Sequence, residues 1–256
     1  MLQWERTVAN SLREAGFVNF LLILVCTIIG VFVLREPIRR WPWVFYILAI
    51  ALDIFLFASW GMTLPSAVNI QKVMLMVRGG LATALFIVVM YMGVLPRGSK
   101  VSKWLRPIRA ELSIIVSFLI AGHMVHYLVS FGSRMLGGSS PADNVAAAII
   151  VGIIMMVFVI VLGVTSFRFV KRHMNVRTWR KLQSGAYVFY VLIFVHVACM
   201  LGPSAVRGGT TALINLIVYS VILISYMVLR IMRAKADKRD KVDLTEAIID
   251  QGFQDK

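Results

Sequence analysis

Three histidines lie within long apolar segments of this 256-residue chain, and their side chains are the best suited to chemistry. They are His123, His126 and His196, whereas His173 lies in a basic stretch between two apolar segments. Ionisable groups are costly inside a lipid bilayer, so they are normally retained there for a function. Two neutral imidazoles that face each other across a helical bundle can ligate a haem iron. A lone intramembrane histidine can also simply hydrogen-bond to a neighbouring helix.

The composition indicates that the segments around these histidines cross a membrane. The chain is 59% hydrophobic and 15% charged, whereas soluble domains carry about 25% charged residues. A helix needs about 20 mostly apolar residues to cross a bilayer. Runs of about this length cover residues 17–34, 43–64, 73–95, 108–131, 145–167, 185–202 and 211–232. The sequence therefore predicts an all-α, polytopic transmembrane helical bundle with about seven spans.

The positions of the basic residues predict how this bundle is oriented. Most of the 27 Lys and Arg residues fall in the loops 35–41, 96–109 and 168–181 and in the tail from residue 230 onward. Basic loops stay on the cytoplasmic side of a membrane protein, which places the N-terminus outside and the C-terminus inside. The net charge of +15 therefore belongs to cytoplasmic loops, and we expect the lipid bilayer rather than nucleic acid as the partner.

This orientation brings two of the histidines to a similar depth. His123 follows Ile108 by 15 residues and His196 follows Gln183 by 13 residues, so the imidazoles rise about 22 Å and about 20 Å from the cytoplasmic side. Both lie in the outer half of the membrane on parallel helices. The sequence predicts that His123 and His196 are the axial ligands of haem b, although packing between helices would also explain the matched depths. His126, one turn beyond His123, could replace it as a ligand or face a haem propionate or a quinone.

Several further residues could serve such a site. Asp53 could relay protons or lie near an interface with a partner, and Arg78 could pair with it across the bundle. Arg134 and Arg207 fall on the outer side, where they could pair with haem propionates or remain solvated loop charges. Small residues that would permit close packing of helices or of a cofactor are Gly79, Gly80, Gly152 and Gly163.

An ordered set of motifs between Arg78 and the end of the last span resembles the ferric-reductase-like transmembrane domain family. The resemblance is closest to the haem-binding membrane subunits called MsrQ or YedZ. Arg109 precedes His123 by fourteen residues, and Gln183 precedes His196 by thirteen residues. The other matching positions are Leu162, Thr165, Ser166, Trp179, Leu182 and Tyr187.

This resemblance implies a function in membrane electron transfer. It implies haem b bound between His123 and His196, with Arg109 on the same cofactor-binding helix. It also implies electron exchange with membrane quinone and with an extracytoplasmic redox subunit, either a flavoprotein or a molybdoenzyme, at a bacterial plasma membrane. Gln183 stands where the family has a further histidine. Glutamine is not a normal haem ligand, so we expect one haem rather than two.

The expected organisation has four parts. Residues 1–16 form an extracytoplasmic segment, 17–72 two N-terminal transmembrane helices, 73–232 the ferric-reductase-like haem-binding bundle, and 233–256 a polar cytoplasmic tail that is amphipathic or disordered. The chain then acts as an electron-transfer subunit of an oxidoreductase complex rather than as a self-contained enzyme. Two alternatives are a haem-free proton-coupled transporter and a membrane anchor for a soluble enzyme, and a haem spectrum distinguishes both from the first interpretation.

Overall fold

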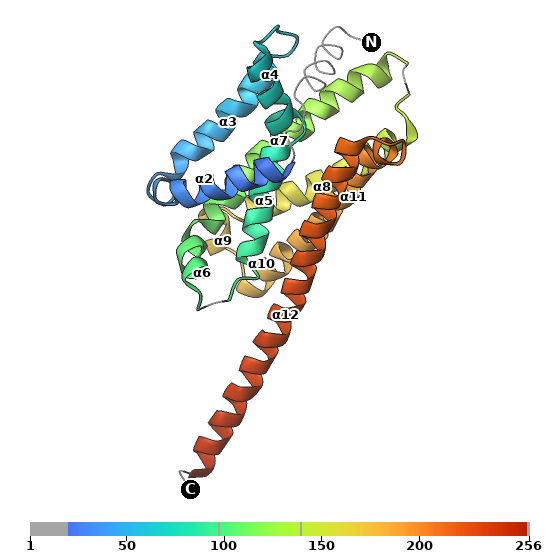
Figure 1. Cartoon of the computed structure of the whole chain (residues 1–256). Coiled ribbons are helices and arrows are strands. Elements are labelled where there is room, and N and C mark those ends of the chain that lie inside the picture. Colours follow the sequence, from blue (N-terminus) through green and yellow to red (C-terminus); the bar gives the residue numbers. More distant parts are fainter. Residues whose placement is uncertain (1–19, 97, 139, 255–256) are drawn as a thin grey trace.

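The computed structural model of the chain describes residues 20–96, 98–138 and 140–254, with side chains up to residue 239. The expected extracytoplasmic segment 1–16 lies outside these residues. Every regular element within them is a helix (Figure 1), which confirms the predicted all-α class. The elements are α2 Phe20–Arg40, α3 Pro42–Ala58, α4 Ser66–Lys72, the π-helix η1 Val73–Val77, α5 Gly80–Met92, α6 Lys100–Leu105, the 3-10 helix η2 Arg106–Ile108, α7 Arg109–Leu136, α8 Asp143–Val164, α9 Arg168–Arg172, α10 Val176–Gln183, α11 Gly185–Val206 and α12 Thr210–Gln254.

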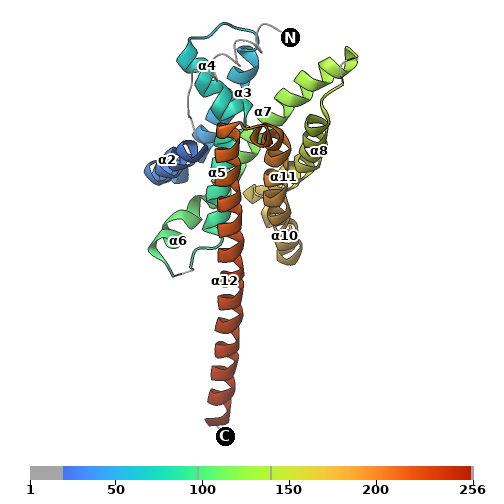
Figure 2. The same cartoon turned by 45° about the vertical axis from the view of Figure 1, so that its right-hand side comes forward.

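Helices α5 and α7 form the centre of the bundle. Helix α7 packs against α3, α5 and α8, while α11 packs between α8 and α12. Helix α5 is apolar on all sides and buries most of its residues, which include Ala84, Phe86 and Met90. Figures 1 and 2 show the remaining helices arranged around α5 and α7. A helix that is apolar all round is stable only when it is enclosed in this way or surrounded by lipid.

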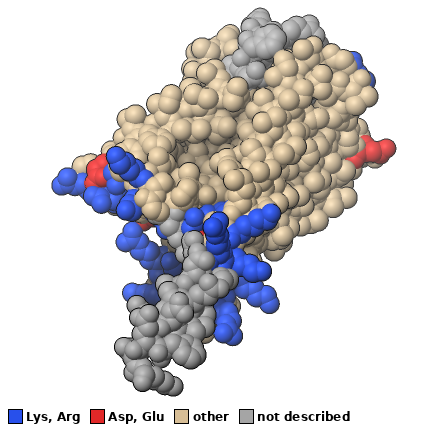
Figure 3. Space-filling model, turned by 60° about the horizontal axis from the view of Figure 1, so that its bottom comes forward, with Lys and Arg blue, Asp and Glu red and all other residues tan. Residues whose placement is uncertain are grey.

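The outer surface of the bundle is apolar, and the basic side chains gather at one end. Large aliphatic side chains such as Ile150, Val157 and Ile224 are about 60% exposed on the outward faces of α8 and α12. Figure 3 shows a broad face without charge and a dense group of Lys and Arg around the base of α12. Exposure of the uncharged apolar face to water would be unfavourable, whereas contact with bilayer hydrocarbon would not. The chain is therefore a multi-pass membrane protein.

The described residues contain five helices that are long and apolar enough to cross a membrane on their own, and a bent pair makes a sixth. Helix α3 is apolar but has 17 residues, which is short for a full span. The predicted count of seven spans therefore depends on α3 and stays a prediction.

The bent pair consists of Ser66–Val77 and Gly80–Met92, whose axes differ by 46°. The break lies at Arg78 and Gly79, and Gly79 adopts a positive φ of 66° that favours glycine. A π-helical turn, η1, precedes the break. Backbone groups that lose helical partners inside a membrane must find partners within the protein, and the break opens such a position beside α7.

Helix α12 continues far beyond the bundle (Figure 1). Its 45 residues correspond to about 67 Å of helix, which is roughly twice the thickness of bilayer hydrocarbon. The polar tail, expected to be amphipathic or disordered, is thus the helical continuation of the last apolar segment.

Candidate functional site

His123 of α7 and His196 of α11 meet inside the bundle. Their ring centroids lie 6.5 Å apart, and the ring planes are inclined at 81°. Both helices pack against α8, but the described residues form no extensive direct interface between α7 and α11. The structure brings together the pair that the matched depths predicted.

Both imidazoles are oriented by hydrogen bonds to backbone carbonyls. His123 Nδ1 donates to the Val77 oxygen at 2.8 Å, and His196 Nδ1 donates to the Ala148 oxygen at 3.0 Å. A carbonyl oxygen can only accept, so each Nδ1 carries the proton. In a neutral imidazole the other nitrogen, Nε2, then has a free lone pair. Histidines that ligate metals adopt this arrangement, because the second bond fixes the tautomer and the ring orientation.

Glycines lie against both imidazoles. A Cβ atom at Gly79 would lie 3.2 Å from His123 Nδ1, and one at Gly152 would lie 4.0 Å from His196 Cε1. Gly79 directly precedes α5 and is two residues beyond Val77, which ends η1 and accepts the hydrogen bond from His123. Close packing of the expected kind is thus seen at Gly79, whereas a side chain at Gly152 would make only ordinary contact with His196.

The separation of the two rings is compatible with two imidazoles that hold one metal ion. Two metal–imidazole bonds of about 2.0–2.1 Å and the distance of about 1.1 Å from each nitrogen to its ring centroid predict a centroid separation near 6.3 Å. The observed separation is 6.5 Å. The described residues contain no group of three or more His, Cys, Asp or Glu side chains that could hold a bare metal ion. A haem needs only two axial protein ligands, because its macrocycle supplies the equatorial ones.

His126 faces a different part of the bundle. Its ring packs against Trp60 with a centroid separation of 4.4 Å and lies 6.3 Å from the ring of Phe57. The side chain is 5% exposed, and its Nδ1 has no hydrogen-bond partner among the described residues. The structure therefore places His126 between α7 and α3, whereas His123 faces His196.

Arg78 does not reach Asp53, its expected partner. The Arg78 guanidinium contacts the sulfur of Met74 at 3.8 Å and lies within the electrostatic range of Tyr127. The Tyr127 ring is itself 5.0 Å from the His123 ring. Arg78 thus belongs to the surroundings of His123, a position that its spacing in the sequence did not reveal.

The two outer arginines lie at the C-terminal ends of α7 and α11. Arg134 is eleven residues beyond His123 and Arg207 eleven residues beyond His196, or about 16 Å along each helix. Arg134 stacks over the ring of Phe131 at 5.4 Å, and Arg207 is exposed at the C-terminal end of α11. Their pairing with propionates stays a prediction.

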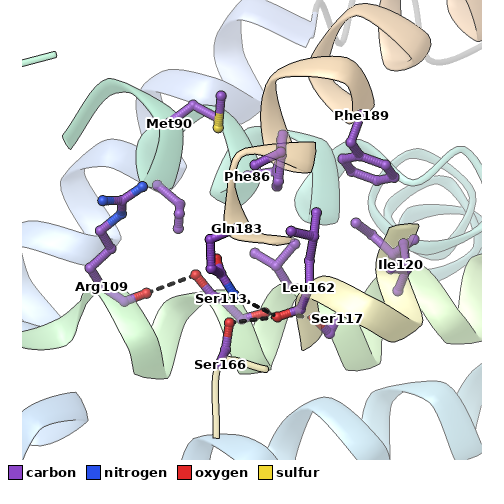
Figure 4. Close-up of a pocket in the computed structure, with 14 residues that line it drawn as sticks. Phe86, Met90, Arg109, Ser113, Ser117, Ile120, Leu162, Ser166, Gln183 and Phe189 are labelled. Carbon is purple, nitrogen blue, oxygen red and sulfur yellow. Dashed lines mark hydrogen bonds between the residues drawn. The ribbon is translucent and has the colours of Figure 1, made fainter. Parts of the chain in front are cut away.

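A separate small cavity, called the lower cavity, lies nearer to the basic loops than the histidine pair does. Figure 4 shows the residues that line it. It has a volume of about 50 Å³ between α5, α7, α8 and α11, and both Arg109 and Gln183 line it. The Gln183 amide nitrogen donates to Thr165 Oγ1 at 2.8 Å and to the Leu162 oxygen at 3.3 Å. Gln183 is therefore tied to the end of α8, and it offers no imidazole to a metal at this level.

Comparison with known proteins relates part of the chain to a membrane-protein family. Residues 78–194 match the family described as Ferric reductase like transmembrane component. This part of the chain, which contains His123, Arg109 and Gln183 and ends two residues before His196, is similar to ferric-reductase-like transmembrane domains.

A relative is known from Treponema pallidum (strain Nichols), where it is described as an uncharacterized protein. It is 33% identical over 175 residues, which cover 67% of this chain and 48% of the relative. The chain thus spans about half the length of this relative. No solved structure matches the chain.

A pair of glycine variants tests whether Gly79 keeps space for His123. Gly79 and Gly61 both have a positive φ, but a Cβ at Gly61 would meet no atom within 4 Å. Both alanine variants should lose about 1–2 kcal/mol through backbone strain. Gly79→Ala should lose about a further 1–3 kcal/mol by overpacking against the imidazole. Thermal unfolding in detergent measures both, and equal losses would contradict this role of Gly79.

Proposed function

We propose that the chain is a membrane cytochrome b subunit that passes electrons through one haem b held by His123 and His196. The observation that carries this proposal is the pair of Nδ1 hydrogen bonds to Val77 and Ala148, at a ring separation of 6.5 Å. Haem bound there supplies one-electron redox chemistry. The chain supplies the two axial nitrogens, fixes their tautomers and surrounds them with apolar helices that exclude water.

The residues of the lower cavity support the proposal that the chain binds one haem and not two. Arg109 and Gln183 precede the two ligand histidines by fourteen and thirteen residues, so they lie about 20 Å farther along α7 and α11. Neither side chain is a normal haem ligand.

A single haem in this position favours a donor that reaches the haem from within the membrane. The basic end of the bundle lies several helical turns from the histidine pair. With one haem, no second redox group would carry electrons between that end and the pair. Membrane quinone is a donor or acceptor that can approach from the lipid side. The other redox partner is then an extracytoplasmic subunit, a flavoprotein or a molybdoenzyme, as the family resemblance implies.

The proposed orientation places the basic end in the cytoplasm of a bacterium and the histidine pair in the outer half of the plasma membrane. The gathering of Lys and Arg around α12 (Figure 3) supports it, since such residues stay on the cytoplasmic side. The first of the described helices, α2, then begins on the outer side.

Alanine variants of the two histidines test the haem proposal. The purified protein should show a b-type reduced-minus-oxidised spectrum, and His123→Ala and His196→Ala should each abolish it because an axial ligand is lost. The matched control is His173→Ala, since His173 is exposed and its Nδ1 donates to the Phe169 oxygen of its own helix. A wild-type protein without a haem spectrum, or a full signal in either ligand variant, would overturn the proposal.

Haem quantification tests the single-site prediction separately. The pyridine haemochrome of the purified protein should give one haem per chain, and Gln183→Ala should leave this ratio unchanged. A ratio of two that falls to one in Gln183→Ala would show that the lower cavity holds a second haem.

Cysteine labelling tests the orientation. In a chain whose Cys26 and Cys199 are replaced by serine, Asp143→Cys at the start of α8 should react with a membrane-impermeant maleimide in intact cells. Arg177→Cys in α10 should react only after permeabilisation. Both positions are exposed, so the reversed pattern would mean that the basic end faces outward.

A further inference from the structure

A half-buried carboxylate lies beside the helix turn that carries His123. Asp53, in the middle of α3, packs so closely on α7 that a Cβ atom at Gly122 would overlap its carboxylate. Gly122 directly precedes His123. The missing side chain of Gly122 thus makes the space that allows an acid to lie against the haem-binding helix.

The Asp53 carboxylate is poorly compensated as an anion. Its Oδ1 atom is buried and has no hydrogen-bond partner in the described part of the chain, and Arg78 is directed toward Met74 instead. A buried charge without a partner is costly, and an acid in such a place avoids the cost by binding a proton. The packing therefore leaves Asp53 able to change between a charged and a neutral form.

The other charged groups around Asp53 are distributed unevenly. From α7, His126 lies one turn beyond Gly122 on the same face, and its Nδ1 is also without a partner among the described residues. Lys72, at the end of α4, acts electrostatically on His126 and donates to the Ser59 oxygen at 3.3 Å. Toward the basic end, Glu111 of α7 is already paired with Arg168 at 2.6 Å. The charged residues of α2, Arg35, Glu36, Arg39 and Arg40, also lie in its last turns at that end.

We propose that Asp53 is a proton-binding site coupled to the redox state of this centre. The inference rests on the proposed haem between His123 and His196. Addition of one electron to the centre adds one negative charge beside α7, and in a medium of low dielectric constant this charge repels the carboxylate. Asp53 takes up one proton as the electron arrives and releases it as the electron leaves, so that charge is balanced within the bundle.

The coupling must act in both directions, because linkage between two bound species is reciprocal. If reduction favours protonation of Asp53, protonation must favour reduction. The midpoint potential of the centre should then fall as the pH rises. For one proton per electron, a tenfold change in proton concentration converts to about 59 mV.

Redox titration of the purified holoprotein over a series of pH values tests the proposal. The wild type should show a slope that approaches this limit over part of the range, and Asp53→Asn should flatten it while the b-type spectrum persists. The matched control Asp143→Asn changes an exposed acid at the start of α8 and should keep the slope. A flat wild-type profile, or a slope that persists in Asp53→Asn, would overturn the proposal, whereas absence of the spectrum would refute the haem assignment itself.

A second measurement covers the case in which Asp53→Asn does not fold. Redox-difference infrared spectra of the wild-type protein should show a protonated carboxyl C=O band that appears on reduction. The band should shift when aspartate is labelled with ¹³C. Identical bands in the oxidised and reduced protein would contradict the coupling.

Discussion

The hydrogen bond from His123 Nδ1 to the Val77 oxygen is the interaction on which the rest of the site depends. A carbonyl inside a continuous helix is normally occupied by its own helical partner, so Val77 is well placed as an acceptor because its helix breaks at Gly79. The break needs the positive φ of Gly79, and the absence of a side chain there lets the His123 ring approach. His196 uses the same chemistry on the unbroken helix α8, where it reaches the Ala148 oxygen beside Gly152. Two rings held in this way each present one free nitrogen.

The sequence predicts part of this arrangement well. The length of the hydrophobic runs predicts apolar helices, and the described residues contain no strand. Residue counts along two helices predict that His123 and His196 lie close together. Other features depend on helix rotation, which run length does not determine. His126 is three residues from His123, yet it packs on Trp60, and Arg78 lies beside Met74 rather than Asp53. The residue type does not indicate which backbone carbonyl, such as that of Val77, accepts a side-chain hydrogen bond. The number of spans depends on whether the short helix α3 crosses the membrane.

The two polar regions of the bundle have different consequences for electron transfer. At the lower level, the Gln183 amide donates hydrogen bonds to Thr165 and Leu162. At the upper level, Asp53 and His126 lie where α3 packs on α7, and Asp53 Oδ1 and His126 Nδ1 have no hydrogen-bond partner among the described residues. In the proposed function, α7 thus carries His123 toward the haem and Gly122 and His126 toward the proton-binding Asp53. In this proposal, His123 and His196 serve electron transfer, and Asp53 serves proton binding.

The central claim is that His123 and His196 ligate the same iron, and near-infrared magnetic circular dichroism of the oxidised protein tests it most directly. The charge-transfer band in this region reports the pair of axial ligands of a low-spin haem. The account predicts the band of bis-imidazole ligation. A band typical of a histidine–methionine pair, or a high-spin spectrum with one open axial position, would contradict it.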